Sequence, residues 1–191
     1  LEMAFVHEDD VIECMEAVMS AVFERAGFDV GPPPWPRMTF AQAVERYGID
    51  RPDTRFGLEL HDLGPALADS QFQVFSSVLA SGGVVKGINA GPRELPRSEL
   101  DALTELPKQH RAKGLVRAFV QAAGTLRSPI AKFLSGIEVG AITERLEASP
   151  GELLLIVADQ PRTAGQALSA LRLELARRFD LIRPPAGEHE P

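Results

Sequence analysis

The sequence predicts an α+β fold, in which residues 56–182 form an α+β sandwich with helices packed on one face of a mixed sheet. From Phe56 onward, strand-like apolar runs alternate with segments whose apolar residues recur at helical spacing, in the order β-β-α-β and then α-β-α. Gly- and Pro-containing turns separate these segments, and the overall composition is that of an ordinary globular protein.

Residues before Phe56 are expected to form two helices joined by extended chain. Asp9 or Asp10 can cap a helix that ends near Ala26. The four prolines of residues 30–36 predict an extended linker. Residues 39–47 then form a short helix, capped by its first residue and stopped by the following glycine.

The second part of the chain carries most of the predicted elements. We expect strands over 72–75, 84–88, 114–121 and 152–158, and helices over 98–111, 135–146 and 163–179. The first two strands are joined by a turn at Gly82-Gly83, which predicts a hairpin. Ser98 and Ser135 each begin a capping box, and Pro107 must kink or shorten its helix.

Charge is distributed unevenly along the chain. Residues 1–63 have a net charge of −8, and residues 64–191 have a net charge of +1. The polar loop 49–55, in which Pro52 disfavours helix, is the expected point at which one domain gives way to another. The Pro-rich residues 183–191 read as a linker.

Several classes of protein are excluded by composition. The longest apolar run, Leu153–Ala158, is far shorter than the roughly 20 residues that cross a membrane, and no signal peptide is visible. The single cysteine, Cys14, excludes an internal disulfide framework and indicates a reducing cytoplasm. The four histidines lack metal-ligand spacing, and no phosphate-binding P-loop is present, so we expect no metal site and no bound cofactor.

One string of residues resembles a known family. Residues 37–56 are similar to a segment of bacterial-type aspartyl-tRNA synthetases, and their second half, residues 46–56, reads Arg-Tyr-Gly-Ile-Asp-Arg-Pro-Asp-Thr-Arg-Phe. In that family the segment lies where the class II catalytic domain gives way to a large insertion, and lysine is usual where Arg51 stands. Residues 1–6 resemble the strand that follows the second class II signature, so the chain is expected to be an internal fragment.

The resemblance continues through the insertion, which is called the GAD domain and is shared with a subunit of a tRNA-dependent amidotransferase. The matching pieces, in the family's order, are residues 113–115, 128–134, 150–154, 158–159 and 168–172. The sequence departs from the family's usual residues at Pro107, Arg117, Glu152 and Ser169. These departures affect details of the sheet and not the family.

The resemblance implies a domain division and an activity. Residues 1–55 would belong to the class II catalytic domain, residues 56–182 to the GAD domain, and residues 183–191 to a linker back to the catalytic domain. The parent would be a cytoplasmic homodimer that joins L-aspartate to tRNA(Asp) through an aspartyl-adenylate, using ATP and Mg²⁺, without binding DNA or membranes. Because the catalytic signatures lie outside this stretch, no catalytic or cofactor-binding residue is carried over, and the fragment is expected to be inactive.

One basic stretch is a candidate for RNA contact, because Lys and Arg bind phosphates without reading sequence. The candidates are Lys86, Arg93, Arg97, Lys108, Arg111 and Lys113, with Arg117 nearby. Four acids, Glu94, Glu99, Asp101 and Glu105, are interspersed with them, so the alternative is a solvated face of mixed charge. Charge alone does not decide between RNA contact and a solvated face, since neither part of the chain is strongly basic.

Other readings remain open. Glu2 could approach an aminoacyl site or only support the fold, Cys14 is expected to pack in a helix, and Asp50 and Asp53 are expected to bond their own backbone. The chain could instead be a non-catalytic GAD-like module or part of an amidotransferase subunit, although residues 1–6 and 37–56 have no reason to precede such a module. An unrelated α+β enzyme would need a clustered acid, base or nucleophile, which the sequence does not show.

Overall fold

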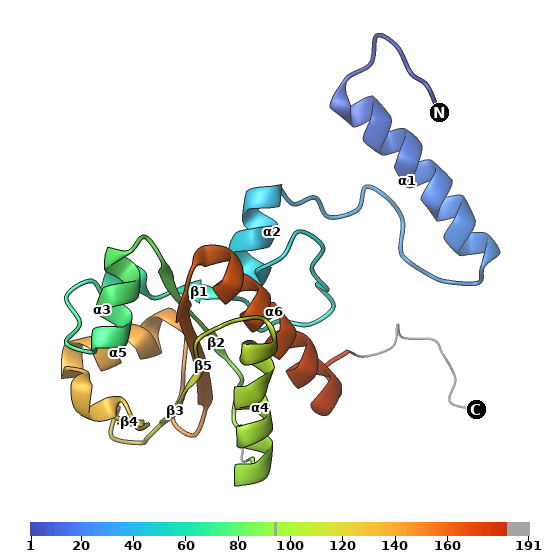
Figure 1. Ribbon diagram of the computed structural model, residues 1–191. Coiled ribbons are helices and arrows are strands. Elements are labelled where there is room, and N and C mark those ends of the chain that lie inside the picture. Colours follow the sequence, from blue (N-terminus) through green and yellow to red (C-terminus); the bar gives the residue numbers. More distant parts are fainter. Residues whose placement is uncertain (94, 183–191) are drawn as a thin grey trace. The chain divides into compact units, whose positions relative to one another are not determined.

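The computed structural model describes residues 1–93 and 95–182, which fall into two compact units divided between Met38 and Thr39 (Figure 1). The larger unit therefore begins before the loop 49–55, where the sequence predicted a change of domain. The linker expected over residues 183–191 lies outside the described residues.

The first unit is built on one helix, α1 (Glu8–Arg25). The backbone N–H of His7 donates to the Asp10 carboxylate at 2.7 Å. Asp10 therefore lies inside the first turn of the helix, and His7, not Asp9 or Asp10, is the residue that precedes the helix. Trp35 folds back on this helix, since its backbone N–H donates to Glu16 Oε1 at 2.9 Å and its ring meets Phe23 edge-on. Residues 1–6, expected to be a strand, pair with no described segment.

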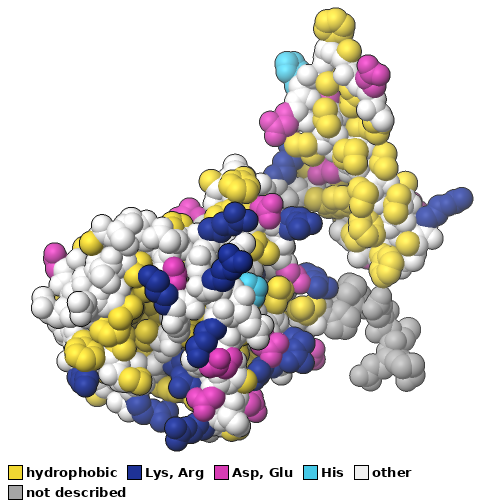
Figure 2. All heavy atoms as spheres, viewed as in Figure 1, with side chains coloured by type: hydrophobic (Ala, Val, Ile, Leu, Met, Phe, Trp, Pro, Cys, Tyr) yellow, Lys and Arg dark blue, Asp and Glu magenta, His cyan; other side chains and the backbone are white. Residues whose placement is uncertain are grey.

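The apolar stripe of α1 is largely exposed within its unit. The stripe consists of Val11, Met15, Val18 and Val22, whose exposed fractions lie between 41% and 54%. Figure 2 shows hydrophobic side chains over much of this unit. The expected single apolar face is present, and the described residues of the unit do not bury it.

The larger unit contains one five-stranded sheet, in the order β1-β2-β5-β3-β4. The strands are β1 (His61–Asp62), β2 (Val84–Asn89), β3 (Val116–Val120), β4 (Leu126–Arg127) and β5 (Leu153–Asp159). Every pairing is antiparallel, so the expectation of a mixed sheet is wrong. The α+β class itself is confirmed.

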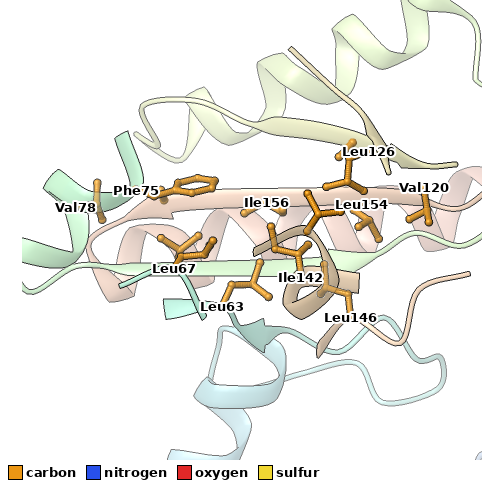
Figure 3. Close-up of a cluster of buried hydrophobic side chains, with 14 residues drawn as sticks. Leu63, Leu67, Phe75, Val78, Val120, Leu126, Ile142, Leu146, Leu154 and Ile156 are labelled. Carbon is orange, nitrogen blue, oxygen red and sulfur yellow. The ribbon is translucent and has the colours of Figure 1, made fainter. Parts of the chain in front are cut away.

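Helices cover both faces of this sheet, and the expectation that they cover one face is wrong. Helices α3 (Gln73–Ala80) and α5 (Gly136–Arg145) pack on one face, and α4 (Arg97–Gln109) and α6 (Pro161–Arg178) on the other. The cause lies in β5, whose seven residues are all buried. Leu154 and Ile156 point into the first core, between the sheet and helices α3 and α5 (Figure 3). Leu153 and Leu155 point into the second core, between the sheet and helices α4 and α6.

The hairpin expected over 72–88 is also wrong. Residues 73–80 are helical, and β2 pairs with β1 and β5. The apolar residues Phe75 and Val78, three positions apart, both point into the first core (Figure 3). A stretch as short as residues 72–75 does not distinguish strand from helix, and burial of one helical face decided the outcome here.

The sequence predicts a helix start best where a side chain accepts a hydrogen bond from a free backbone N–H group of the first turn. Ser135 accepts from Glu138 N–H and donates its own backbone N–H to the Glu138 carboxylate at 2.7 Å, which confirms the capping box of α5. Helix α4 instead begins after Pro96, so Ser98 lies inside its first turn. Helix α6 begins at Pro161, two residues before the expected cap, because proline is favoured at the first helical position.

Helix α2 (Phe40–Tyr47) has the expected cap at Thr39 and ends at Gly48, which has a φ of +81°. At this point the chain passes very close to α6. A Cβ on Gly165 would lie 2.8 Å from the Gly48 carbonyl oxygen, and a Cβ on Gly48 would meet the Gly165 backbone more closely still. The two glycines therefore allow backbone-to-backbone packing that no larger residue permits.

We expect Gly165→Ala to lower the free energy of unfolding by about 1–3 kcal/mol, because the added methyl group forces the two backbones apart. Chemical denaturation followed by circular dichroism measures the change. Gly140→Ala is the matched control: it lies inside α5 with no atom within 4 Å of its Cβ position, and should stabilise by about 0.5–1 kcal/mol. Equal effects of the two substitutions would contradict the packing argument.

Arg172 of α6 anchors the loop that follows α2. Its side chain is 1% exposed, and its guanidinium donates to the carbonyl oxygens of Leu58 at 2.7 Å, Gly57 at 2.9 Å and Asp53 at 3.2 Å. The rings of Tyr47 and Phe56 lie 4.7 and 4.6 Å from its Cζ atom. Burial lowers the pKa of Arg172 from its usual value, and arginine nevertheless stays charged in proteins.

Replacing Arg172 by Met should cost about 3–5 kcal/mol of stability, because several buried carbonyl groups lose their donor while the side-chain volume is kept. Arg162, an exposed residue of the same helix with no ion pair among the described residues, provides the control, since Arg162→Met should leave the unfolding midpoint nearly unchanged. If both variants unfolded at the same denaturant concentration, the buried guanidinium would have no special role.

Candidate basic groove

Three arginines line an open groove of about 930 Å³ in the larger unit. We call this site the arginine groove, defined by Arg93, Arg97 and Arg127 around Phe119 and Gly151. Arg93 follows β2, Arg97 begins α4, and Arg127 lies on β4. The groove therefore collects positive charge from three separate segments of the chain.

The register of the sheet places Arg127 in the groove. Phe119 of β3 pairs directly with Arg127 of β4 across the antiparallel ladder, so both side chains leave the same face. The Arg127 Cζ atom lies 4.5 Å from the centre of the Phe119 ring. A tight turn closes this ladder, because the backbone N–H of Gln121 donates to Thr125 O at 2.8 Å.

Among the described residues, Arg93 and Arg127 lie against aromatic rings and not against carboxylates. The Arg93 Cζ atom lies 4.2 Å from the centre of the Phe179 ring, and its Nε donates to Ala90 O at 3.1 Å. Among residues 1–93 and 95–182, neither arginine has an ion-pair partner. Arg97 is 95% exposed and lies 3.9 Å from Asp101, which Arg117 approaches more closely at 3.2 Å. The positive charge of the groove is thus weakly compensated by the described residues.

The remaining basic candidates lie outside the residues that line this groove. Lys86 Nζ donates to the Glu45 carbonyl of α2 at 3.1 Å, and Lys108 pairs with Glu105 at 2.6 Å. Arg111 follows α4 with a φ of +66°. Lys113 is exposed, and its backbone N–H donates to Asp159 Oδ2 at 3.0 Å. The structure thus brings Arg93 and Arg97 together and leaves the other four candidates apart from them.

Sequence reasoning missed Arg127 as a member of the group. It lies 30 positions after Arg97, beyond the basic stretch from Lys86 to Arg117. Only the pairing of β3 with β4 brings it beside the other two arginines. The sequence signal that could have found it is the turn around Gly124, which predicts an antiparallel return of the chain.

A second groove, of about 630 Å³, shares Arg93 but has a different character. Its lining includes the carboxylates of Glu59 and Glu147 and the ring of His61. Hydrogen bonds from Arg46 hold the pKa of Glu59 below its usual value, so this carboxylate is ionised at neutral pH. Since Glu59 is paired with Arg46 and Glu147 opposes the charge of Arg93, the second groove lacks the excess of positive charge that an anion needs.

The other residues singled out in the sequence lie in ordinary surroundings. Cys14 is a half-buried free thiol of α1, and Glu2 is exposed. The Asp53 carboxylate accepts the Arg55 backbone N–H at 3.0 Å and pairs with the Arg55 guanidinium at 2.7 Å, while Asp50 is exposed. Among the described residues, no group of three or more His, Cys, Asp or Glu side chains is placed to hold a metal ion.

The comparison with protein families matches residues 75–168 to the GAD domain. These residues run from α3 to α6 and include the central strands β2, β3 and β5 and all three arginines of the groove. The chain carries a GAD domain. The expectation from the sequence is confirmed on this point, and the arginine groove belongs to the GAD domain.

Similarity to known proteins extends beyond the GAD domain. The chain is 46% identical over 186 residues to the aspartate–tRNA(Asp/Asn) ligase of Symbiobacterium thermophilum, and 43% identical over 185 residues to the aspartate–tRNA ligase of Clostridium acetobutylicum, each match covering 96% of the chain. It is 42% identical over its whole length to the aspartate–tRNA(Asp/Asn) ligase of Natranaerobius thermophilus. The chain spans about a third, 31–32%, of the length of these relatives.

None of the helices in the part of the chain that the structure describes is both long enough and apolar enough to cross a bilayer.

Beside the GAD-domain core, α4 and α6 are joined by an ion-pair network. Glu174 accepts from Arg177 at 2.9 Å and from Arg178 at 2.5 Å, and Arg178 reaches Glu99 of α4 at 3.5 Å. Hydrogen bonds from Arg177 and Arg178 lower the pKa of Glu174 to about 2. These two arginines are therefore engaged within the fold, unlike those of the groove.

Glu174→Gln should reduce stability at neutral pH by about 0.5–1 kcal/mol, because the ionised carboxylate holds two arginines. Since the folded-state pKa is below that of the unfolded chain, this stabilisation is complete above about pH 4.5 and disappears as the pH falls toward 2. Thermal unfolding across this range measures the difference. Glu144→Gln, at an exposed residue of α5 with no ion pair among the described residues, serves as the control and should show no such pH dependence.

Proposed function

We propose that this chain is part of an aspartate–tRNA ligase, an enzyme that attaches L-aspartate to tRNA(Asp) through an aspartyl-adenylate. The observation that carries the proposal is the 42–46% identity to such ligases over nearly all of the chain, on both sides of the GAD domain. The part before Phe56 is included in this match, which favours the ligase over a GAD-like module or an amidotransferase subunit.

The chemistry of that reaction would be supplied by the remainder of the protein. Attack of the aspartate carboxylate on the α-phosphate of ATP needs positive groups and Mg²⁺ around the developing charge. Among residues 1–93 and 95–182, no group of acids is suited to a metal ion, and no Asp, Glu or His lines the arginine groove to act on a substrate. In our proposal the chain contributes architecture and tRNA contact, within a cytoplasmic homodimer.

We further propose that residues 1–55 belong to the catalytic domain of the ligase, and that residues 183–191 lead back to it. The loop between α2 and β1 is then the crossing between two domains. Arg172 and the contact of Gly48 with Gly165 hold this crossing against α6. Such an anchor would fix the point at which the GAD domain leaves the catalytic domain.

The purified 191-residue chain should show no aspartate-dependent exchange of pyrophosphate into ATP, because the groups that stabilise the transferring phosphate lie elsewhere. The product of the complete gene should catalyse the exchange and should charge tRNA(Asp), and it serves as the positive control. Robust exchange by the short chain would overturn our assignment of its role. Failure of the complete protein to charge tRNA(Asp) would overturn the proposed function.

A further inference from the structure

We propose that the arginine groove of the GAD domain is a binding site for the phosphates of an RNA strand. The inference deepens the proposed function, on which it rests for the identity of the partner. It assigns the contact to Arg93, Arg97 and Arg127, and so replaces a diffuse basic stretch with one defined site.

The state of the three guanidinium groups supports an anionic partner. Arg93 and Arg127 each lie against an aromatic ring, which fixes the side chain without neutralising its charge. Arg97 is almost fully exposed, and its contact with Asp101 is long because Asp101 is closer to Arg117. Guanidinium groups bind phosphate oxygens in a bidentate manner, and here three of them line one open groove.

The shape and lining of the groove favour a phosphate backbone over a small nucleotide. The groove is open, and its charges come from three separate segments of the chain, so a strand lying in it can offer a phosphate to more than one arginine. The other described residues of its lining are mainly apolar, including Leu95 and Leu100, and Gln121 is the polar side chain among them that could bond a base. Such a site positions RNA without reading its sequence.

The contacts that the other basic candidates make within the fold explain why they are left out of the proposed site. Lys86, Lys108 and Arg117 already bind protein oxygen atoms, so recruiting them to RNA would break bonds within the fold. Arg111 and Lys113 lie past the far end of α4 from Arg97. Removing charge at that end should therefore leave groove binding almost intact.

The experiment compares two double variants of the 191-residue chain that lose the same charge. Arg97→Gln with Arg127→Gln removes two exposed charges from the groove, and Lys108→Gln with Arg111→Gln removes two from the opposite end of α4. Fluorescence anisotropy with a labelled tRNA(Asp) transcript measures affinity between about 50 and 200 mM salt. Circular dichroism and the thermal midpoint establish that both variants are folded.

We expect the groove variant to bind tRNA about tenfold more weakly and to show a smaller dependence of affinity on salt, by about one unit of slope for each phosphate that the variant no longer binds. The control variant should bind like the unaltered chain. Equal weakening in both variants would show a diffuse charge effect and would overturn the proposal, as would the absence of tRNA binding by the unaltered chain at low salt.

Two competitors test the chemistry of the ligand. ATP at the same concentration of phosphate should displace the transcript poorly, because it spans only part of the groove. Poly-L-glutamate at equal charge should also compete poorly if the site suits a phosphate backbone, and efficient displacement by either competitor would contradict the proposal. Charging of tRNA(Asp) by the complete protein tests the proposed function separately. If the complete protein charged tRNA(Asp) normally with the groove substitutions, and the 191-residue chain did not bind RNA, only this inference would be refuted.

Discussion

The buried guanidinium of Arg172 is the interaction on which the N-terminal part of the larger unit depends. A charge removed from water must find oxygen atoms, and the carbonyls of Asp53, Gly57 and Leu58 provide them. The loop is consequently held against α6, and the guanidinium itself lies against the rings of Tyr47 and Phe56. The same contacts hold α2 close enough to α6 for Gly48 and Gly165 to touch through their backbones.

The central strand β5 organises the rest of the GAD domain. It separates two cores, and its neighbours β2 and β3 carry the segments that border the arginine groove. Gly151, just before β5, donates its N–H to Val120 O at 2.8 Å and so fixes one wall of the groove to the end of β3. The groove is thus formed by regular backbone pairing, although its side chains are largely exposed.

How far sequence reasoning reached depended on the range of the interaction concerned. Thr39 with Gly48, and Ser135 with Glu138, mark helix ends through contacts a few residues apart, and the structure has these ends as expected. Residues 73–80 were mistaken for part of a hairpin because their conformation is decided by burial of Phe75 and Val78 in a distant core. In the same way, the stretch from Lys86 to Lys113 is rich in basic residues, but the fold places their side chains in different surroundings.

The sequence by itself determined the α+β class, the family of the GAD domain and the capped helices, because each of these follows from local pattern or from residues in a recognisable order. Only the tertiary structure decided that helices cover both faces of the sheet, that Arg172 is buried beneath the loop, and that Arg127 joins Arg93 and Arg97. These features depend on strand order and register, which bring together residues far apart in the chain, and no local periodicity records which strands will pair.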